Sequence, residues 1–527
     1  MEKEKQKEII NYFLKKEILL SQDFLNSLAE DFSPEGLNQA ISQNLGASGI
    51  LVLTSDVIKM VDKGAELDTN WVDFEKARVL FEKGENKSLY FKFIDFQRAE
   101  EVDKAKQASS VNVLFSYKKE SKKRDIQDFV AYFNARYKAL EKLLRKRAEL
   151  QNLTSIARLK NKKDKETISI IGIVKEKRNS SKGGIMLTLE DPTEYIKVYI
   201  NNNKPDLFNP AKDIVLDEVI GVVGVSGNKI LFANKILWPE IPLSKELKKS
   251  PDECYVVFLS DFHVGSNKFL PNEFNQFLEW INVRLGTEEH KEIAKKVKYV
   301  FVAGDLVDGL GIYPGQEEEL SIKDTKKQYE ECANLLKKIP PHIQIIICPG
   351  NHDAMRIAEP QPELYKDYAE KIWELPNVTM VSNPAMVNIH SSADFPGFDV
   401  LMYHGYSFDY YVANVDSIRS QGGYDRADLI MQFLLQRRHL APTHTSTLYI
   451  PDVAQDPLVI EKIPDIFVTG HIHKAAIHNY RNVTLVCGSC WQAKTPFQEK
   501  VGHNPEPARV PVLNLQTRKY KLLKFGK

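Results

Sequence analysis

The sequence predicts a multidomain protein in which a C-terminal α/β domain is preceded by a β-barrel and by a small helical N-terminal module. Its length of 527 residues is enough for about three domains. The hydrophobic pattern changes twice along the chain, from helical spacing to short β-rich runs and then to buried strands that alternate with helices. Hydrophobic residues make up 43% of the chain and aromatic residues 10%, which suits folded cores and excludes a largely disordered chain.

Charge and composition exclude several other classes of protein. Lysine and arginine number 72 and aspartate and glutamate 71, so the net charge of +1 creates no strong field toward nucleic acid or a membrane. The longest apolar runs, such as 297–302 and 343–348, are far shorter than the ~20 residues that span a bilayer. The charged N-terminus is unlike a secretory signal, and five cysteines argue against a disulfide framework. We therefore expect a cytoplasmic protein with no membrane partner.

The first 160 residues are expected to contain a helical module, a linker and a long helix. We expect the module at 1–60, where apolar residues fall at helical spacing and Ser33-Pro34-Glu35 is typical of a helix start. Residues 61–125 are highly charged with little periodicity, which favours a charged linker. Residues 126–160 contain a strong helix leading into the core, because Ile126, Phe129, Val130, Phe133, Tyr137, Leu140 and Leu144 repeat at steps of three and four.

Residues 165–243 predict a small β-barrel, most simply an OB-fold. Two turn segments, Gly183-Gly184 and Ser226-Gly227-Asn228, separate short β-rich runs. The five runs are Ile168–Val174, Ile185–Leu189, Tyr195–Ile200, Val219–Val225 and Ile230–Phe232. Such a barrel either binds single-stranded nucleic acid or acts as a scaffold, and no groove with aromatic and basic residues is evident, which favours the scaffold.

Residues 251–527 predict an α/β domain in which buried strands alternate with helices. The near-continuous apolar runs are Tyr255–Leu259, Tyr299–Val302, Ile343–Ile347, Val400–Tyr403, Ile466–Val468 and Thr484–Val486. Each run ends in a polar cluster, which is typical of α/β layers that bind ligands at the carboxyl ends of their strands.

Five of these polar clusters share one chemistry. In order they are Asp261-Phe262-His263, Gly304-Asp305-Leu306-Val307-Asp308, Gly350-Asn351-His352-Asp353, His404-Gly405 and Gly470-His471-Ile472-His473. Carboxylate, imidazole and amide groups suit Mn²⁺, Fe²⁺ or Zn²⁺. A lone Asp-x-His is usually an unremarkable surface pair, but five such clusters following successive strands predict a catalytic centre with two metal ions. The glycines let the backbone approach that centre without a Cβ clash.

This order of motifs resembles the calcineurin-like metallophosphoesterase superfamily. The resemblance implies a calcineurin-like phosphoesterase domain after the OB-fold. It implies that one divalent ion binds Asp261, His263, Asp305 and His473, and that the other binds Asp305, Asn351, His404 and His471. Asp305 would bridge the ions, which we expect to be Mn²⁺, with Mg²⁺, Fe²⁺ and Zn²⁺ as alternatives. His352 matches the histidine that acts on the scissile phosphate without binding metal. Asp308 stands where repair nucleases of the superfamily have a histidine, so metal tuning, a hydrogen bond to His352 and a structural role all stay open.

The chain as a whole resembles the small subunits of archaeal family-D DNA polymerases. The features that carry this narrower resemblance are the helical N-terminus, the OB-fold directly before the phosphoesterase motifs, Arg437–Pro442 and Gly488–Gln492. The resemblance implies a proofreading 3′–5′ exonuclease in an archaeal cell, associated with the nucleoid. It would pair as a heterodimer with the large catalytic subunit and act on primer-template DNA and single-stranded 3′ ends. The alternatives are a phosphoesterase for RNA or small phosphoesters and a non-catalytic polymerase scaffold.

Weaker patterns mostly favour plain structural roles. Gln6, Ile9, Tyr12 and Phe13 have the spacing of a sliding-clamp-binding peptide, although one face of an amphipathic helix explains them better. Lys118-Lys119 and Lys122-Lys123-Arg124 could contact DNA phosphates, but a solvated linker is favoured. Cys487 and Cys490 have zinc-knuckle spacing without a second cysteine pair, so we expect buried thiols. Tyr410, Tyr411 and Arg419 are candidates to line a DNA path.

Overall fold

The computed structural model describes residues 111–118, 123–159, 165–500 and 503–526, together with short pieces of the first 53 residues (9–13, 15, 19–20, 24, 28, 33–35 and 52–53). The chain forms two compact units, Met1–Asp103 and Lys104–Lys527. Within the described residues no helix is both long and apolar enough to cross a membrane.

The described pieces of the first unit combine a helical segment at 9–13 with two short strands. Strand β1 (Leu19–Leu20) pairs in parallel with β2 (Val52–Leu53), so the module that we expected to be helical also contains a pair of short strands. Ile9 and Phe13 are buried, as the inner face of an amphipathic helix requires. Gln6 and residues 54–110, which include most of the expected linker, lie outside the described residues.

The predicted β-barrel is confirmed. Five strands close in the order β4-β5-β6-β8-β7 around a core of aliphatic side chains. Their bounds are β4 (Thr167–Asn179), β5 (Ile185–Asp191), β6 (Glu194–Ile200), β7 (Val219–Gly227) and β8 (Ile230–Leu237), with helix α9 (Pro205–Ala211) between β6 and β7. Helix α7 (Ile126–Leu144) begins at Asp125, whose side chain caps the helix, and α8 (Ile156–Leu159) follows before the barrel.

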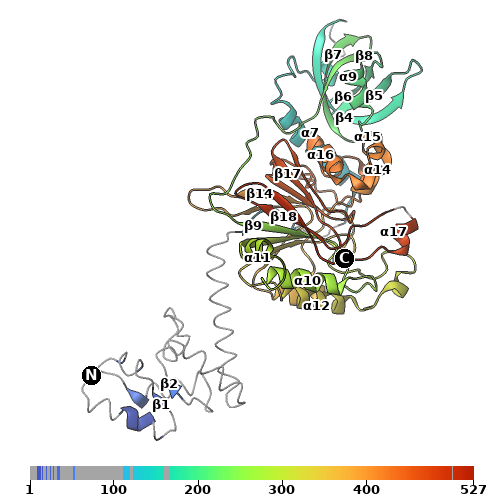
Figure 1. Ribbon diagram of the computed structural model, residues 1–527. Coiled ribbons are helices and arrows are strands. Elements are labelled where there is room, and N and C mark those ends of the chain that lie inside the picture. Colours follow the sequence, from blue (N-terminus) through green and yellow to red (C-terminus); the bar gives the residue numbers. More distant parts are fainter. Residues whose placement is uncertain are drawn as a thin grey trace. The chain divides into compact units, whose positions relative to one another are not determined.

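The C-terminal domain contains two six-stranded sheets. The first has the order β12 (Val378–Met380), β11 (Gln344–Cys348), β10 (Val297–Ala303), β9 (Tyr255–Leu259), β18 (Arg509–Asn514) and β19 (Tyr520–Lys524). The second has the order β16 (Ala476–Tyr480), β17 (Val483–Cys487), β15 (Ile466–Thr469), β14 (Phe398–Met402), β13 (Ala385–Ile389) and β3 (Val111–Ser116). Side chains of both sheets, such as Phe258 and Val400, share one fully buried core, so the sheets pack face to face (Figure 1).

Helices cover the outer face of each sheet. Helices α10 (Pro271–Ile281), α11 (Glu288–Lys295), α12 (Thr325–Leu336) and α13 (Lys366–Trp373) pack on the first sheet. Helices α14 (Phe408–Asn414), α15 (Asp416–Ser420) and α16 (Ala427–Arg437), together with α7, pack on the second. The remaining short helices are η1 (Gln316–Glu319), η2 (Gly423–Asp425), η3 (His444–Ser446) and α17 (Pro496–Lys500). The domain is therefore built of four layers, with helices outside and two sheets inside (Figure 1).

The expected linker at 61–125 is wrong at its C-terminal end. Residues 111–116 form strand β3, which pairs antiparallel with β13 and completes the edge of the second sheet. Strand β3 is only six residues long, and its partner strand β13 lies about 270 residues further along the chain. A contact of that sequence separation leaves no local signal.

A buried ion pair fixes α7 to the C-terminal domain. Arg136 Nε lies 2.7 Å from Asp456 Oδ2, and both side chains are fully buried. The Tyr132 hydroxyl donates to Asp456 Oδ1 at 2.7 Å, and His439 Nε2 lies 2.8 Å from Asp456 Oδ2. A second buried pair, between Arg437 of α16 and Glu218 at the edge of the barrel, connects the barrel to the same domain. The segment 437–442 that carries part of the family resemblance is therefore a joint between domains.

We predict that Arg136→Met destabilises the protein strongly. Removing one partner leaves the Asp456 carboxylate buried with less compensation, which typically costs about 3–5 kcal/mol. Arg145→Met, at the C-terminal cap of the same helix, removes an exposed pair with Glu141 and should cost less than about 1 kcal/mol. Chemical unfolding of both variants beside the wild type tests this, and equal stabilities for the two variants would contradict it.

Candidate metal centre

The predicted site residues come together where strands of both sheets end. Asp261 and His263 follow β9, Asp305 follows β10, and Asn351 and His352 follow β11. His404 follows β14, and His471 and His473 follow β15. Parallel pairing of β9, β10 and β11 in one sheet, and of β14 and β15 in the other, places these loops at one edge of the packed sheets.

The backbone at these positions is unusual. The backbone angle φ lies between 52° and 71° at five of the predicted site residues, which are Asp261, His263, Asp305, His471 and His473. Non-glycine residues with positive φ are uncommon, and they concentrate at functional sites because the local strain must be offset by the surrounding structure. Glycine is required close by, since a Cβ at Gly350 would lie 2.2 Å from Asp305 Oδ1 and one at Gly470 would lie 2.6 Å from Asp261 Oδ2.

The first half of the centre contains Asp261, His263 and His473. The Nε2 atoms of His263 and His473 lie 3.1 Å apart, and His473 Nε2 is 3.4 Å from Asp261 Oδ1. Asp261, His263 and His473 each offer one ligand atom, and these atoms lie within 4.8 Å of one another. Burial would lower the pKa of His473, but Cys490 and Asp261 raise it well above the ordinary value, whereas burial lowers the pKa of His263.

The second half contains Asn351, His404 and His471. Asn351 Oδ1 lies 2.9 Å from His404 Nε2 and 3.0 Å from His471 Nδ1. His404 is fully buried, which would lower its pKa, but the charge of Asp305 raises that pKa to about 10. Asn351 and His471 are only half-buried, so this half of the centre is the more open to solvent.

The residues fit divalent cations. The Nδ1–H of His404 donates to the carbonyl of Ala303, since a carbonyl can only accept, and in the neutral ring this leaves a lone pair on Nε2. Nε2 lies 3.3 Å from Asp305 Oδ2, so a lone pair and a carboxylate face each other in a buried space. That arrangement needs positive charge between the groups, which either protons or metal ions supply. The nitrogen and oxygen donors suit Mn²⁺, Fe²⁺ and Zn²⁺.

Asp308 contacts both neighbouring histidines. Its Oδ1 lies 3.0 Å from His263 Nδ1, and its main-chain carbonyl lies 2.9 Å from His352 Nδ1. Gln316 and Gln492 each donate a hydrogen bond to its carboxylate, which fixes its orientation. Of the roles left open by the sequence, the carboxylate therefore orients His263 and only the backbone contacts His352. Such carboxylate–histidine pairs are typical partners of metal ligands.

His352 lies beside the centre. Its backbone N–H donates to Asp305 Oδ1 at 2.7 Å, and its ring is 4.7 Å from the His263 ring. Because the Asp308 carbonyl only accepts, Nδ1 carries the proton of that bond and Nε2 is the nitrogen that the bond does not use. The side chain is half-buried, at the open side of the centre.

Sequence reasoning missed two carboxylates. Asp409 of α14 lies 3.1 Å from His471 Nε2, a contact made through space that no motif spacing indicates. Asp353 stands inside the Gly-Asn-His-Asp motif, and its Oδ2 accepts from the backbone N–H groups of Asp305 and Gly350. Burial and the charge of Asp305 raise the pKa of Asp353 to about 7. The position of Asp353 inside this motif could have identified it as part of the site.

The weaker candidates divide between buried and exposed positions. Tyr410 is half-buried near Asp409, Tyr411 is buried in the core of α14, and Arg419 pairs with Asp416. Cys487 and Cys490 are buried free thiols, as expected. In the basic run, Lys118 pairs with Glu363 at 3.4 Å, and residues 119–122 lie outside the described residues.

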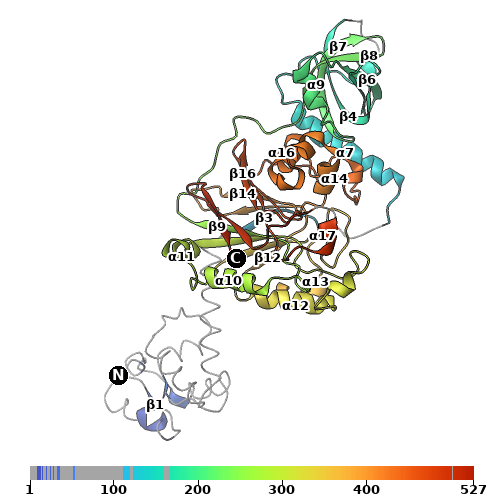
Figure 2. The same ribbon diagram turned by 45° about the vertical axis from the view of Figure 1, so that its right-hand side comes forward.

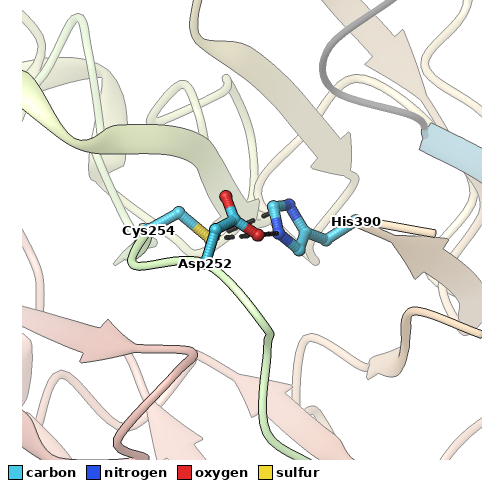
Figure 3. Close-up of side chains that lie close together, drawn as sticks. All are labelled: Asp252, Cys254 and His390. Atoms are coloured by element: carbon cyan, nitrogen blue, oxygen red, sulfur yellow. Dashed lines mark hydrogen bonds and ion pairs between the residues drawn. The ribbon is translucent and has the colours of Figure 1, made fainter. Parts of the chain in front are cut away.

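Another group of potential ligands lies at the opposite end of β9. Asp252, Cys254 and His390 are close together, with His390 Nε2 2.7 Å from Asp252 Oδ1 (Figure 3). The Cys254 sulfur is 3.7 Å and 3.6 Å from the two ring nitrogens, so it lies on neither lone-pair axis. Burial raises the pKa of Cys254 to about 12, which disfavours the thiolate that binds metal. We interpret this group as hydrogen-bonded packing.

The fold and the centre define a two-sheet α/β protein with a polar, metal-compatible site at its strand ends and a barrel joined to it. A family model for the B subunits of DNA polymerases alpha and epsilon matches residues 256–478. The DNA polymerase II small subunit of Methanothermobacter thermautotrophicus is 36% identical over 521 residues, which cover 98% of this chain and 100% of the relative. The chain belongs to the family of archaeal DNA polymerase II small subunits, the small subunits of family-D DNA polymerases.

Other relatives match about three quarters of the chain. The DNA polymerase II small subunit of Pyrococcus furiosus is 41% identical over 404 residues, covering 76% of this chain and 64% of the relative. That of Archaeoglobus fulgidus is 39% identical over 394 residues, covering 75% and 76%. Among solved structures, asparaginyl-tRNA synthetase from Pyrococcus horikoshii overlaps 16% of this chain and 22% of its own at 16% identity, with a TM-score of 0.15, which is too little to define a shared fold.

Proposed function

We propose that this chain is the proofreading 3′–5′ exonuclease subunit of a replicative family-D DNA polymerase, and that it hydrolyses DNA phosphodiesters at a centre with two divalent ions. The observation that carries the proposal is the position of Asp305. Its Oδ2 lies 3.3 Å from His404 Nε2 and 4.0 Å from His263 Nε2. A carboxylate between two histidines that follow strands of different sheets is suited to bridging two ions.

The residues divide into two ligand sets that share Asp305. We assign Asp261, His263, Asp305 and His473 to one ion, and Asp305, Asn351, His404 and His471 to the other. The oxygen and nitrogen donors favour Mn²⁺ over a metal selected by thiolates, and Mg²⁺, Fe²⁺ and Zn²⁺ are the alternatives. When bound, such ions neutralise the charge of a phosphodiester and lower the pKa of a water molecule that attacks phosphorus.

The protein's own groups orient the substrate and handle the proton of the leaving group. Asn351, His352 and His471 are half-buried, so a phosphodiester would approach from their side. His352 Nδ1–H is held by the Asp308 carbonyl, which would leave Nε2 to face the scissile phosphate. A proton on Nε2 would stabilise the charge that develops on the phosphate or pass to the leaving 3′-oxygen, and a positioned acid of this kind typically contributes about 10²–10⁴-fold in rate.

Two other functions use the same fold. A phosphoesterase for RNA or small phosphoesters would use the same ligands, but the barrel and the N-terminal module would then be surplus. A non-catalytic polymerase scaffold would not need buried carboxylates and histidines that face each other at strained backbone positions. The exonuclease is therefore the better explanation of the centre.

We predict that Asp305→Ala and His352→Ala fail differently. Asp305→Ala should weaken both ions and abolish cleavage, because the bridging carboxylate is lost. His352→Ala should keep metal binding and lose about 10²-fold or more in the rate of cleavage. Calorimetric titration with Mn²⁺ beside single-turnover degradation of a 3′-mismatched primer separates the two variants.

Three outcomes of that experiment would count against the proposal. Hydrolysis of p-nitrophenyl phosphate with an intact primer would favour the small-phosphoester function. Mn²⁺ binding without any hydrolysis would favour the scaffold. Loss of an ion in His352→Ala, or near-normal cleavage by it, would show that the role given to His352 is wrong.

We predict that the two outer carboxylates each support one ion. Asp308 contacts His263 and Asp409 contacts His471, so Asp308→Asn and Asp409→Asn should each weaken a different Mn²⁺ ion by about 10–100-fold. Asp416→Asn, which changes an exposed carboxylate of the neighbouring helix α15, should leave both affinities unchanged. Calorimetric Mn²⁺ titration reports the number and affinity of sites. Equal Mn²⁺ affinities in all three variants would show that neither Asp308 nor Asp409 supports metal binding.

We also propose that the chain forms a heterodimer with the large catalytic subunit and acts on primer-template DNA and single-stranded 3′ ends in the archaeal cytoplasm. Its net charge of +1 gives it little independent grip on DNA, so a partner should hold the substrate. A sliding-clamp contact through Gln6, Ile9, Tyr12 and Phe13 is not part of this proposal, because Ile9 and Phe13 are buried.

We predict that the chain elutes as a 1:1 complex when mixed with the large subunit. Size-exclusion chromatography with light scattering, at micromolar concentration of each chain, measures this directly. The large subunit incubated with bovine serum albumin is the control. Separate elution of the two subunits would contradict the heterodimer.

A further inference from the structure

A cavity of about 600 Å³ opens beside the candidate metal centre. Its walls come from α7, from residues 406–410 at the start of α14 and from the segment 444–449. Helices α7 and α14 lie between the barrel and the sheets (Figure 2). Two wall residues connect it with the centre. Asp409 Oδ2 lies 3.1 Å from His471 Nε2, and the Tyr406 ring lies 5.8 Å from the His471 ring. A molecule at the open side of the centre would therefore reach the cavity directly.

The lining selects a flat, uncharged molecule. The exposed Leu448 adds an apolar surface to the cavity. Aromatic rings come from Phe129, Tyr406, Tyr410 and His444. Among the described residues that line the cavity there is no lysine or arginine, and Asp409 is the one carboxylate. A phosphate would find no cation here, whereas a nucleobase could stack on the rings. Stacking of bases on aromatic side chains tolerates any sequence, because every base has a π-face.

The cavity is held in shape by hydrogen bonds behind its walls. The Tyr411 hydroxyl donates to Ser446 Oγ at 3.0 Å, and the Tyr449 hydroxyl donates to the Thr443 carbonyl at 2.9 Å. The His444 backbone N–H donates to Asp217 near the barrel at 2.9 Å. A wall that is already ordered loses little conformational entropy when a ligand binds.

We propose that this cavity binds the nucleobase of an unpaired 3′-terminal nucleotide while its phosphodiester lies at the metal centre. The proposal rests on the proposed exonuclease function and adds the source of its preference for unpaired ends. A base must leave the duplex stack to enter the cavity, and that cost is least for a mismatched or single-stranded base. The cavity thus selects the end that needs removal, whereas the metal centre treats all phosphodiesters alike.

The experiment compares two oligonucleotides that differ only in their last base. One carries an unpaired 3′-terminal nucleotide and the other a 3′-terminal abasic sugar, so the scissile phosphodiester is the same. With the full-length chain and Mn²⁺, the wild type should prefer the base-bearing end in kcat/KM by about tenfold or more. Tyr410→Ala and Leu448→Asp should each bring this ratio close to one, and Tyr410→Phe should retain it because the ring remains. Tyr368→Ala, an exposed tyrosine on α13 outside the cavity, is the matched control and should also retain it.

A binding measurement separates failure of the cavity from failure of the nuclease. A single strand ending in 2-aminopurine should lose fluorescence on binding to the wild type with Ca²⁺ in place of Mn²⁺, and should lose much less with Tyr410→Ala. If the wild type cleaves neither oligonucleotide, the proposed exonuclease function is wrong. Stronger quenching by the wild type than by Tyr410→Ala would still support base binding in the cavity. Equal base preference and equal quenching in wild type and Tyr410→Ala would overturn the cavity proposal. If Tyr410→Ala instead binds the large polymerase chain more weakly, with base preference unchanged, the cavity belongs to that interface and the proposal is overturned too.

Discussion

The contact between Asp305 and His404 is the interaction on which the candidate centre depends. Asp305 follows a strand of the first sheet and His404 follows a strand of the second, and His404 Nε2 lies 3.3 Å from Asp305 Oδ2. Neither sheet alone carries both halves of the centre. The contact exists because apolar side chains such as Phe258 and Val400 pack the sheets against each other in one buried core. A shift of one sheet against the other would therefore move His404, His471 and His473 away from Asp261, Asp305 and Asn351, and would disrupt both ligand sets.

That packing also offsets the strain of the ligand loops. Five of the seven proposed ligands have positive φ, and each such residue costs of order 1–3 kcal/mol. The backbone is held there by hydrogen bonds between the loops. The Asp261 N–H donates to the Gly304 carbonyl, and the His263 N–H donates to the Asp305 carbonyl. The first two motifs follow the paired strands β9 and β10 and thus stabilise each other.

The sequence was a good guide where structure is local and a poor guide where it is not. The barrel strands and the strands that precede each motif follow from apolar runs and turns a few residues long, so they could be predicted together with the seven polar residues that the structure brings to one edge of the sheets. The division into two sheets could not be predicted, because strand pairing depends on contacts such as that of β3 with β13, about 270 residues apart. Asp409 was missed for the same reason. The orientation of the Asp308 carboxylate toward His263 could be found only from the structure, because the position of Asp308 in the sequence is compatible with a contact to His263 or to His352.

Helix α7 connects the stability of the molecule with the proposed choice of substrate. Arg136 holds the helix through Asp456, and Phe129, two turns earlier on the same helix, lines the cavity beside the centre. His439 stays neutral in this network. Its Nδ1 accepts from the Ala441 N–H, and burial together with the nearby charge of Arg136 lowers its pKa to about 4. A group whose pKa is lowered on folding contributes stability above its unfolded pKa of about 6.5 and loses it as the pH falls toward 4. The network that holds α7 therefore keeps its full stability at neutral pH, and acid would weaken the joint through which α7 brings Phe129 to the cavity.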